Sequence, residues 1–486
     1  MKGRNMVKFQ TLCRSAIVIW IWNGFSALGT VYHSDGSAAS LQGLQNQVLN
    51  GDTITIPAGT FTWRTRVTIS KSITLQGAGV GQSIIKDAVN ETPLIQVGLV
   101  ANKLTRITGI EFQDGGRANN QLGVLQFVGS NTDGSRLRMD HCKVNDLNGM
   151  VVADTVIGVM DHNTFIRATK NGSSVVIYDN NWNGRTNGDG SWTDTTQFGS
   201  DRFLFLEDNV FQNNGDDQPG ITDAYAGARF VVRHNQIFDR TVQTHGTETT
   251  GRPRGARAVE VYNNTFTGSD RNRLLGGMRS GILLFHDNAI SGYWTGSTEF
   301  TLQCYRAVDT FNPWGGADGT NQWDINSGPF YSGTASAGGN HTVSVSGSPW
   351  TSNQWVGYTI RRDAGGSPGF GEILSNTRNT ITFSSGLFGN LNFTPGNTFK
   401  IYKVNQAIDQ PGRARGSLIT GNPPVRPAAW NDQVTEPCYA WNNISGGTQQ
   451  VGFGRGNLVV RPGEHYFNNT RMPGYVPYTY PHPLVR

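Results

Sequence analysis

The sequence has 486 residues, of which 62 are glycine, 36% are hydrophobic and 15% are charged. This composition excludes a disordered chain, and the length allows a large buried core. The formal net charge of +5 comes from 40 basic residues, 9 Lys and therefore 31 Arg, and arginine suits carboxylate, phosphate or sulfate partners. We expect no nucleic-acid partner, because no nucleic-acid-binding motif occurs and the N-terminus predicts export.

The first segment, residues 1–29, predicts a secretion signal. Basic residues precede an apolar run from Ala16 to Trp22, and the small residues Ala27 and Gly29 suit cleavage. The apolar run is short for a membrane span, with an uncleaved anchor as the alternative. We therefore expect a secreted or periplasmic protein that has no membrane partner after the signal is removed.

The cysteines do not form the framework of a disulfide-rich protein. Cys13 would be removed with the signal, which leaves Cys142, Cys304 and Cys438, an odd number without metal-site spacing. At most one bridge could form, and buried free thiols are the favoured interpretation.

The segment after the signal predicts a short helix followed by strands. Residues 37–49 have an amphipathic helical pattern, and strand-like segments follow at 51–63, 66–79 and 82–88. The strings GDTITIPAGTFTW and ITLQGAG within these segments resemble the opening of the pectin lyase-like superfamily. The resemblance implies an all-β fold, a right-handed parallel β-helix solenoid with a short N-terminal capping helix.

The middle of the chain contains a repeat that is visible without the resemblance. Its segments are MDHCKV, MDHNTF, IYDNNW, LEDNVF, VRHNQI, VYNNTF and FHDNAI, with the fourth residues Cys142, Asn163, Asn180, Asn209, Asn235, Asn264 and Asn288. Positions five and three before and two after this residue are almost all apolar and are predicted to face the interior, because strand side chains alternate. The asparagines are predicted to form a structural ladder of hydrogen-bonded amides in left-handed backbone positions. The preceding histidines, His141, His162 and His234, are predicted to be structural as well.

The repeat divides the chain into segments. Residues 30–290 are predicted to form the parallel β-helix, and residues 291–436 break the repeat and predict an inserted β-rich module. Residues 437–486 predict a return of the β-helix followed by a C-terminal wrap, with the Pro-rich end, 473–483, lying over the last coil. We expect a monomer.

Polar residues on the predicted outer face and in three consecutive loops form the candidate site. The outward residues are Glu207, Arg233, Glu260, Tyr262 and His286. The loops contribute Asp216, Asp217, Asp223, His245, Arg252, Arg254, Arg257 and Arg279. Because loops at one position of consecutive coils emerge on one side, these groups are predicted to form one arginine-rich strip. A solvated face with ion pairs is the alternative for the outward residues.

These residue types predict eliminative cleavage of an acidic, uronate-containing polysaccharide. Arginines would neutralise the uronate carboxylate, His245 or an arginine would remove the adjacent proton, and Tyr262 would protonate the leaving oxygen. The catalytic candidates are His245, Arg254, Arg257, Glu260 and Arg279, and the candidates for substrate binding are Arg233, Tyr262, His286, Glu207 and Arg252. The resemblance to β-helix lyases implies calcium, for which Asp216, Asp217 and Asp223 would supply oxygen ligands.

Two other functions are open. The segments Asn214–Asp217, His245–Gly246 and Arg254 or Arg257 resemble polygalacturonase motifs, which implies a glycoside hydrolase with two carboxylates across the scissile bond. This match lacks the glycine before the histidine and the final lysine of that family. A non-catalytic glycan-binding or adhesion protein is the second alternative, because a long solenoid offers a flat surface that can hold a polymer.

Overall fold

The computed structural model describes residues 29–486 apart from 91, 120, 169–171, 216–219, 245–253, 270–274, 293–299, 304–328, 357, 364–368, 385–390, 403–410, 415–433 and 457–459. The described part is all-β, with the short helices α1 (Ala38–Gln47) and α2 (Asp189–Thr193) and 3₁₀ turns η1 (Trp182–Gly184), η2 (Thr186–Gly188) and η5 (Pro483–Val485). The predicted signal lies outside it except for Gly29. No helix in these ranges has the length and hydropathy needed to span a membrane.

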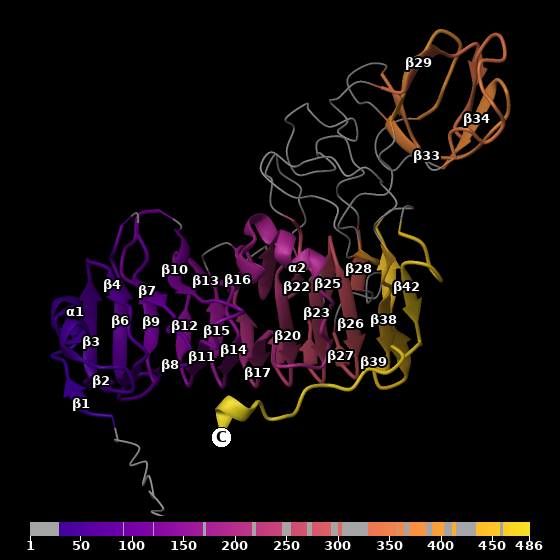
Figure 1. The fold of residues 1–486 in the computed structure, drawn as a ribbon. Helices are drawn as coiled ribbons and strands as arrows, with labels where there is room; N and C mark the ends of the chain where they lie inside the picture. Colours follow the sequence, from indigo (N-terminus) through magenta and orange to yellow (C-terminus); the bar gives the residue numbers. More distant parts are fainter. Residues whose placement is uncertain are drawn as a thin grey trace, which may run out of the picture.

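Two long sheets of mainly parallel strands run from one end of the molecule to the other (Figure 1). Sheet 1 contains, in spatial order, β1 (Val31–His33), β2 (Thr53–Ile56), β5 (Thr74–Gly77), β8 (Leu104–Thr108), β11 (Arg136–Asp140), β14 (Gly158–Asp161), β17 (Leu204–Glu207), β20 (Arg229–Arg233), β23 (Ala258–Tyr262), β26 (Ile282–His286), β38 (Cys438–Trp441) and β42 (Tyr466–Asn468). Sheet 2 contains β3 (Gly59–Trp63), β6 (Ser83–Asp87), β9 (Glu111–Asp114), β12 (Lys143–Asn145), β15 (Thr164–Arg167), β18 (Val210–Asn213), β21 (Gln236–Phe238), β24 (Thr265–Thr267), β27 (Ala289–Ser291), β39 (Asn443–Ser445) and the antiparallel β40 (Gln449–Val451).

Two shorter parallel sheets complete the solenoid. Sheet 3 contains β19 (Thr222–Tyr225), β16 (Val175–Tyr178), β13 (Gly149–Asp154), β10 (Gln121–Val128), β7 (Ile95–Gly98) and β4 (Val67–Ile69). Sheet 4 contains β22 (Val242–Gln243), β25 (Gly276–Met278), β28 (Phe300–Leu302) and β41 (Phe453–Arg455). Successive strands from β2 to β28 fall in turn into sheet 1, sheet 2 and then sheet 3 or 4, so three strands make one coil. The predicted all-β, parallel, solenoid-like fold is therefore confirmed.

The predicted helix and the predicted interior columns are present. Helix α1 begins where the side chain of Ser37 caps it by accepting the N–H of Ser40. In sheet 1 the column Leu204, Phe230, Val259 and Leu283 is in register from strand to strand and fully buried. One continuous core fills the solenoid from the first coils to the last. Burial of this apolar interior is the main force that stacks the coils.

The asparagine ladder is confirmed, although its backbone conformation differs from the prediction. Asn235 Nδ2 donates to Asn264 Oδ1 at 2.9 Å, and Asn264 Nδ2 donates to Asn288 Oδ1 at 3.0 Å. The left-handed backbone belongs instead to the residue before each asparagine, for example His234 with φ 56° and Asn263 with φ 53°. The turn bends at that preceding residue, which leaves the asparagine side chain buried in the solenoid.

One of the seven aligned segments lies in a different sheet from the other six, contrary to the prediction. The strand of this segment, β16 (Val175–Tyr178), belongs to sheet 3 rather than sheet 1, and Asn180 follows it. The ladder passes directly from Asn163 to Asn209, with Asn163 Nδ2 donating to Asn209 Oδ1 at 3.1 Å. The difference has a physical cause. Strands in every sheet of a solenoid alternate inward and outward residues, so this alternation does not identify the sheet to which a strand belongs.

The segment predicted as an insert contains a separate small β module. Antiparallel strands form one sheet in the order β29 (Tyr331–Thr334), β35 (Thr398–Tyr402), β32 (Thr359–Arg362), β33 (Gly369–Asn376), β34 (Thr380–Phe383), β31 (Thr342–Ser344) and β30 (Ala337–Gly338). This module has its own core, which includes Trp350 and Trp355. The solenoid itself continues past residue 291, because β28 pairs with β25. A two-stranded ribbon of β36 (Arg413–Ala414) and β37 (Val434–Thr435) precedes the return to sheet 1.

The C-terminal segment, residues 470–486, runs back along the outer face of sheet 1. In Figure 1 it is the yellow, irregular segment that extends from β42 toward β17. Tyr478, Leu484 and Val485 pack on an apolar patch of the outer face that includes Val159 and Phe205. The prediction places the Pro-rich end over the last coil, whereas in the structure this segment extends along the outer face as far as β14 and β17.

The described cysteines are free and buried. Cys142 and Cys438 form no disulfide, which agrees with the predicted free thiols. Cys304 lies outside the described residues.

Candidate functional site

Several predicted site residues cannot be placed in the structure. His245, Arg252, Asp216 and Asp217 lie outside the described residues. Asp223 is on β19 in sheet 3, where its carboxylate accepts the N–H of Ala224 at 2.9 Å and the hydroxyl of Tyr225 at 3.2 Å. No group of three or more metal-binding side chains is found in the described ranges. The roles assigned to these residues, including the calcium ligands, remain predictions.

Arg254 and Arg257 are buried, in contrast to the exposed strip predicted for them. Arg254 Nε lies 3.0 Å from Asp189 Oδ1, and Arg257 Nη2 lies 2.9 Å from Glu436 Oε2. Both guanidinium groups lie over the ring of Trp192 in helix α2. The residues between β16 and β17, which include helix α2, therefore cover this part of the solenoid. The spacing of the sequence repeat does not predict this cover.

Arg279 is the third described arginine of the predicted catalytic set. It follows β25 in sheet 4, is half-buried, and its backbone N–H donates to Thr244 Oγ1 at 3.0 Å. It was predicted to emerge beside His245, and that neighbour is outside the described residues.

The five outward residues do share one face of sheet 1, as predicted, but the C-terminal segment covers them. Arg233 Nε donates to Glu207 Oε2 at 2.7 Å, and its Nη1 donates to the Tyr262 hydroxyl at 2.8 Å. The same guanidinium donates to the backbone carbonyls of Tyr478 and Thr479, at 2.7 and 2.8 Å. These side chains are therefore a buried polar layer beneath the segment rather than a solvated face.

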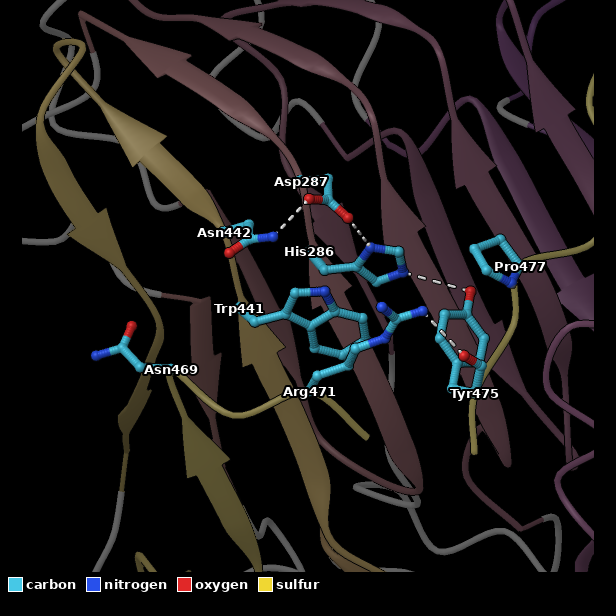
Figure 2. A pocket seen from close by; sticks show the side chains of 8 residues that line it. All are labelled: His286, Asp287, Trp441, Asn442, Asn469, Arg471, Tyr475 and Pro477. Carbon is cyan, nitrogen blue, oxygen red and sulfur yellow. Dashed lines mark hydrogen bonds and ion pairs between the residues drawn. The ribbon is translucent and has the colours of Figure 1, made fainter. Parts of the chain in front are cut away.

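The outer face opens beside this covered layer into a pocket of about 430 Å³ (Figure 2). The pocket lies where β26 and β38 meet the beginning of the C-terminal segment. Its described lining is His286, Asp287, Trp441, Asn442, Asn469, Arg471, Tyr475 and Pro477. Of the residues predicted for the site, His286 is one that lines it.

A stack of aromatic rings forms the floor of the pocket. The ring of His286 lies between those of Tyr262 and Trp441, at centroid distances of 4.7 and 4.1 Å and interplanar angles of 6° and 5°. The three residues come from neighbouring strands in register, Tyr262 beside His286 and His286 beside Trp441. Parallel pairing of β23, β26 and β38 therefore produces the stack directly. The ring of Tyr475 is nearly perpendicular to those of His286 and Trp441, with interplanar angles of 75° and 70°.

Hydrogen bonds connect His286 to groups on both sides. Asp287 Oδ2 lies 2.7 Å from Nδ1 of His286, and the Tyr475 hydroxyl lies 3.3 Å from Nε2. The same hydroxyl is hydrogen bonded to the buried Glu260. Burial lowers the pKa of His286, whereas the hydrogen bond with His286 lowers the pKa of Asp287. At neutral pH the pocket therefore presents an ionised Asp287 at its rim.

Arg471 and two amides supply the remaining polar groups. Arg471 is exposed, and its Nη2 donates to the backbone carbonyl of Tyr475 at 3.2 Å. Asn442 Nδ2 donates to Asp287 Oδ1 at 3.0 Å. Asn469 lies on the side of Trp441 that is opposite to Tyr475 (Figure 2). A ring face, a guanidinium group and amides are groups that bind a sugar acid by stacking, ion pairing and hydrogen bonding.

Sequence reasoning missed most residues of this pocket. Trp441 could have been found, because Asn443 continues the ladder and places Trp441 in the same outward column as His286. Arg471 and Tyr475 carry no periodic signal, because they belong to an irregular segment whose course the sequence pattern does not give.

Comparisons with known proteins do not assign a family. No family model and no curated protein matches this chain. A solved structure of ORF18 of Geobacillus virus E2 is similar over 75% of this chain and 78% of that chain, with 11% sequence identity and a TM-score of 0.30. A similarity at this level carries no argument about fold or function.

Proposed function

We propose that the solenoid is a right-handed parallel β-helix of the pectin lyase-like type and that it binds an acidic, uronate-containing polysaccharide. The observation that supports binding is the pocket beside His286, where the exposed Arg471 lies close to the aromatic floor. A uronate unit could pack against the exposed part of Trp441 in this pocket while its carboxylate pairs with the guanidinium group. The long outer face of sheet 1 offers room for neighbouring units of the polymer.

We further propose that the bound polymer is cleaved by elimination. In this reaction a base removes the proton on carbon 5 of the uronate, and a double bond forms between carbons 4 and 5. The bond between carbon 4 and the glycosidic oxygen breaks, and that oxygen takes up a proton. His286 is the proposed base, because burial lowers its pKa and keeps the imidazole neutral, and the Tyr475 hydroxyl beside it is the proposed acid.

A glycoside hydrolase is less well supported by this geometry. Hydrolysis requires two carboxyl groups on opposite sides of the scissile bond, and Asp287 is the one acidic residue in the described lining of the pocket. Non-catalytic binding is the stronger alternative, because both His286 and Tyr475 are largely buried. Export, calcium binding and a monomeric state are proposed on the sequence alone.

Binding is tested with a defined oligogalacturonate, and a neutral oligoglucose is the comparison ligand. Arg471→Gln removes the guanidinium group, and a charge-assisted hydrogen bond is worth about 1.5–3 kcal/mol, so affinity should fall by at least about tenfold. The matched control is Arg455→Gln, which removes another exposed arginine of the last coil and should leave affinity unchanged. Equal affinities in all three proteins would reject this pocket as the binding site.

Cleavage is tested separately, by ultraviolet absorbance of the unsaturated product across pectate, alginate and glycosaminoglycan substrates, with and without calcium. Absorbance that is lost in His286→Gln would support elimination. New reducing ends without absorbance would indicate a hydrolase. Binding without any change in polymer length would indicate a glycan-binding protein.

A further inference from the structure

A chain of four side chains connects the pocket to a carboxyl group outside it. Asp287 Oδ2, His286 Nδ1 and Nε2, the Tyr475 hydroxyl and Glu260 Oε2 follow one another within hydrogen-bonding distance. Glu260 comes from β23, is 1% exposed and is not part of the pocket lining. Its other oxygen, Oε1, accepts the backbone N–H of Gly199 at 2.9 Å. Both oxygens of the Glu260 carboxyl group therefore have hydrogen-bond partners. Oε2 is the oxygen that belongs to the chain of four side chains.

The number of hydrogens in this chain restricts the charges of its members. If His286 is neutral and donates from Nδ1 to Asp287, then Nε2 must accept from Tyr475. The oxygen of Tyr475 must then accept from a protonated Glu260. If Glu260 is ionised instead, Tyr475 donates to it, and both nitrogens of His286 must carry hydrogens. The two arrangements contain the same hydrogens and the same net charge. They differ in whether Glu260 or His286 carries the additional proton, with Tyr475 passing its own hydrogen on as it receives another.

We propose that these four side chains share one proton, so that ionisation of the buried carboxyl group and a change of tautomer at the imidazole of the pocket occur together. When the shared proton leaves, one link must break. A neutral His286 that donates from Nε2 would turn a bare Nδ1 toward the carboxylate of Asp287, which is a repulsive contact. Asp287, whose side chain is 40% exposed, can then turn toward water. The rim of the pocket would rearrange as a result.

The surroundings of Glu260 favour retention of the proton near neutral pH. Burial raises the pKa of Glu260 to about 7, although the hydrogen bonds from Tyr475 and Gly199 and the charge of Arg233 on β20 act in the opposite direction. Arg233 is itself paired with Glu207, which limits its effect on the second carboxyl group. The shared proton is therefore expected to leave at around pH 7.

The surroundings of His286 make a lasting imidazolium ion unfavourable. Burial lowers its pKa, Asp287 raises it, and the charge of Arg471 in the C-terminal segment lowers it. The rings on its two faces are the uncharged Trp441 and Tyr262, and burial raises the pKa of the latter. The proton is thus expected to lie mainly on the Glu260 side, with His286 neutral.

Nitrogen NMR of imidazole-labelled protein tests the sharing of the proton without any ligand. The signals of His286 are assigned among the nine histidines by their loss in His286→Gln. In the wild type, the signals of its two nitrogens should shift together with a midpoint near the value for Glu260, about pH 7. Glu260→Gln keeps a hydrogen-bonding group but removes the titrating proton, so this shift should disappear. Tyr475→Phe breaks the chain and should have the same effect.

The control is Tyr478→Phe, which alters a tyrosine of the same segment that is outside the chain and should leave the shift in place. Identical midpoints in the wild type, Glu260→Gln and Tyr475→Phe would overturn the proposal. If Tyr475→Phe loosens the C-terminal segment, as amide exchange would show, then Glu260→Gln alone decides. An effect of the proton on ligand affinity rests on the proposed function, but the NMR result does not, so the two proposals can fail separately.

Discussion

The Nε of Arg233 lies 2.7 Å from Oε2 of Glu207, and both side chains are fully buried. The pair is enclosed on one side by sheet 1 and on the other by the C-terminal segment, whose backbone supplies the N–H of His482 to Glu207 Oε1 at 2.9 Å. The buried charges are therefore satisfied by residues from both layers. An ion pair in this position attaches the segment to the wall.

Arg233→Met should destabilise the protein strongly. Removal of one partner leaves the carboxylate of Glu207 buried without its countercharge, which costs about 3–5 kcal/mol in comparable cases. The free energy of unfolding in urea at neutral pH measures this loss. Arg461→Met is the control, because Arg461 and Glu464 are more than a third exposed and such surface pairs contribute up to about 1 kcal/mol. A midpoint equal to that of the wild type would show that the buried pair does not hold the segment.

Asn235→Ala should interrupt the ladder. The Asn235 side chain accepts the N–H of Asn209 at 2.8 Å and donates to the carbonyl of Leu206 at 2.9 Å, and both groups would lose a buried partner. Each unsatisfied buried group costs about 1–3 kcal/mol, so unfolding should become easier by at least about 2 kcal/mol. Gln236→Ala, at the exposed next residue, should change stability by less than about 0.5 kcal/mol. Similar losses in the two variants would argue against a structural ladder.

The buried carboxyl group of Glu260 should give the protein a distinct pH dependence of stability. Burial raises its pKa in the folded protein from 4.5 to about 7. Between these values the folded state retains a proton that the unfolded state has released, so stability falls as pH rises through this window, by at most about 1.4 kcal/mol per pH unit. Below pH 4.5 the stabilisation from this group is fully present and no longer changes with pH. The difference in unfolding free energy between wild type and Glu260→Gln should follow this course, and a difference independent of pH would contradict it.

The two described thiols should be unreactive in the folded protein. Burial raises the pKa of Cys142 and of Cys438 to about 12, and the thiolate is the reactive form. In a variant with Cys13 and Cys304 replaced by Ser, iodoacetamide should modify neither cysteine until denaturant is added. Mass spectrometry of the native protein gives the answer, and rapid labelling at neutral pH would contradict the burial of these side chains.

The repeat in the sequence was sufficient to predict the parallel, solenoid-like fold. The inward columns depend on burial, which selects apolar residues such as Phe230 and Val259 at fixed spacing. The same spacing also predicted that Arg233, Glu260 and His286 share one face, and the strand register agrees. Periodic positions are predictable because each coil repeats the same physical environment.

The cover over that face could not be predicted in the same way. Tyr475 and Tyr478 belong to a segment without a repeat, and its contacts with β20 and β23 join residues more than 200 positions apart. The burial of Arg254 by helix α2 has the same origin. Contacts of this kind depend on where an irregular segment crosses the wall, and a single sequence holds no pattern for them.

The course of the C-terminal segment has a consequence for folding. A solenoid ordinarily gains stability from contacts between adjacent coils, so that its two ends can melt independently. Here the last residues of the chain lie on β14 and β17, and they join early coils to late ones. Completion of the middle of the wall therefore requires residues 470–486 to dock on it, and we expect their removal to make unfolding less cooperative.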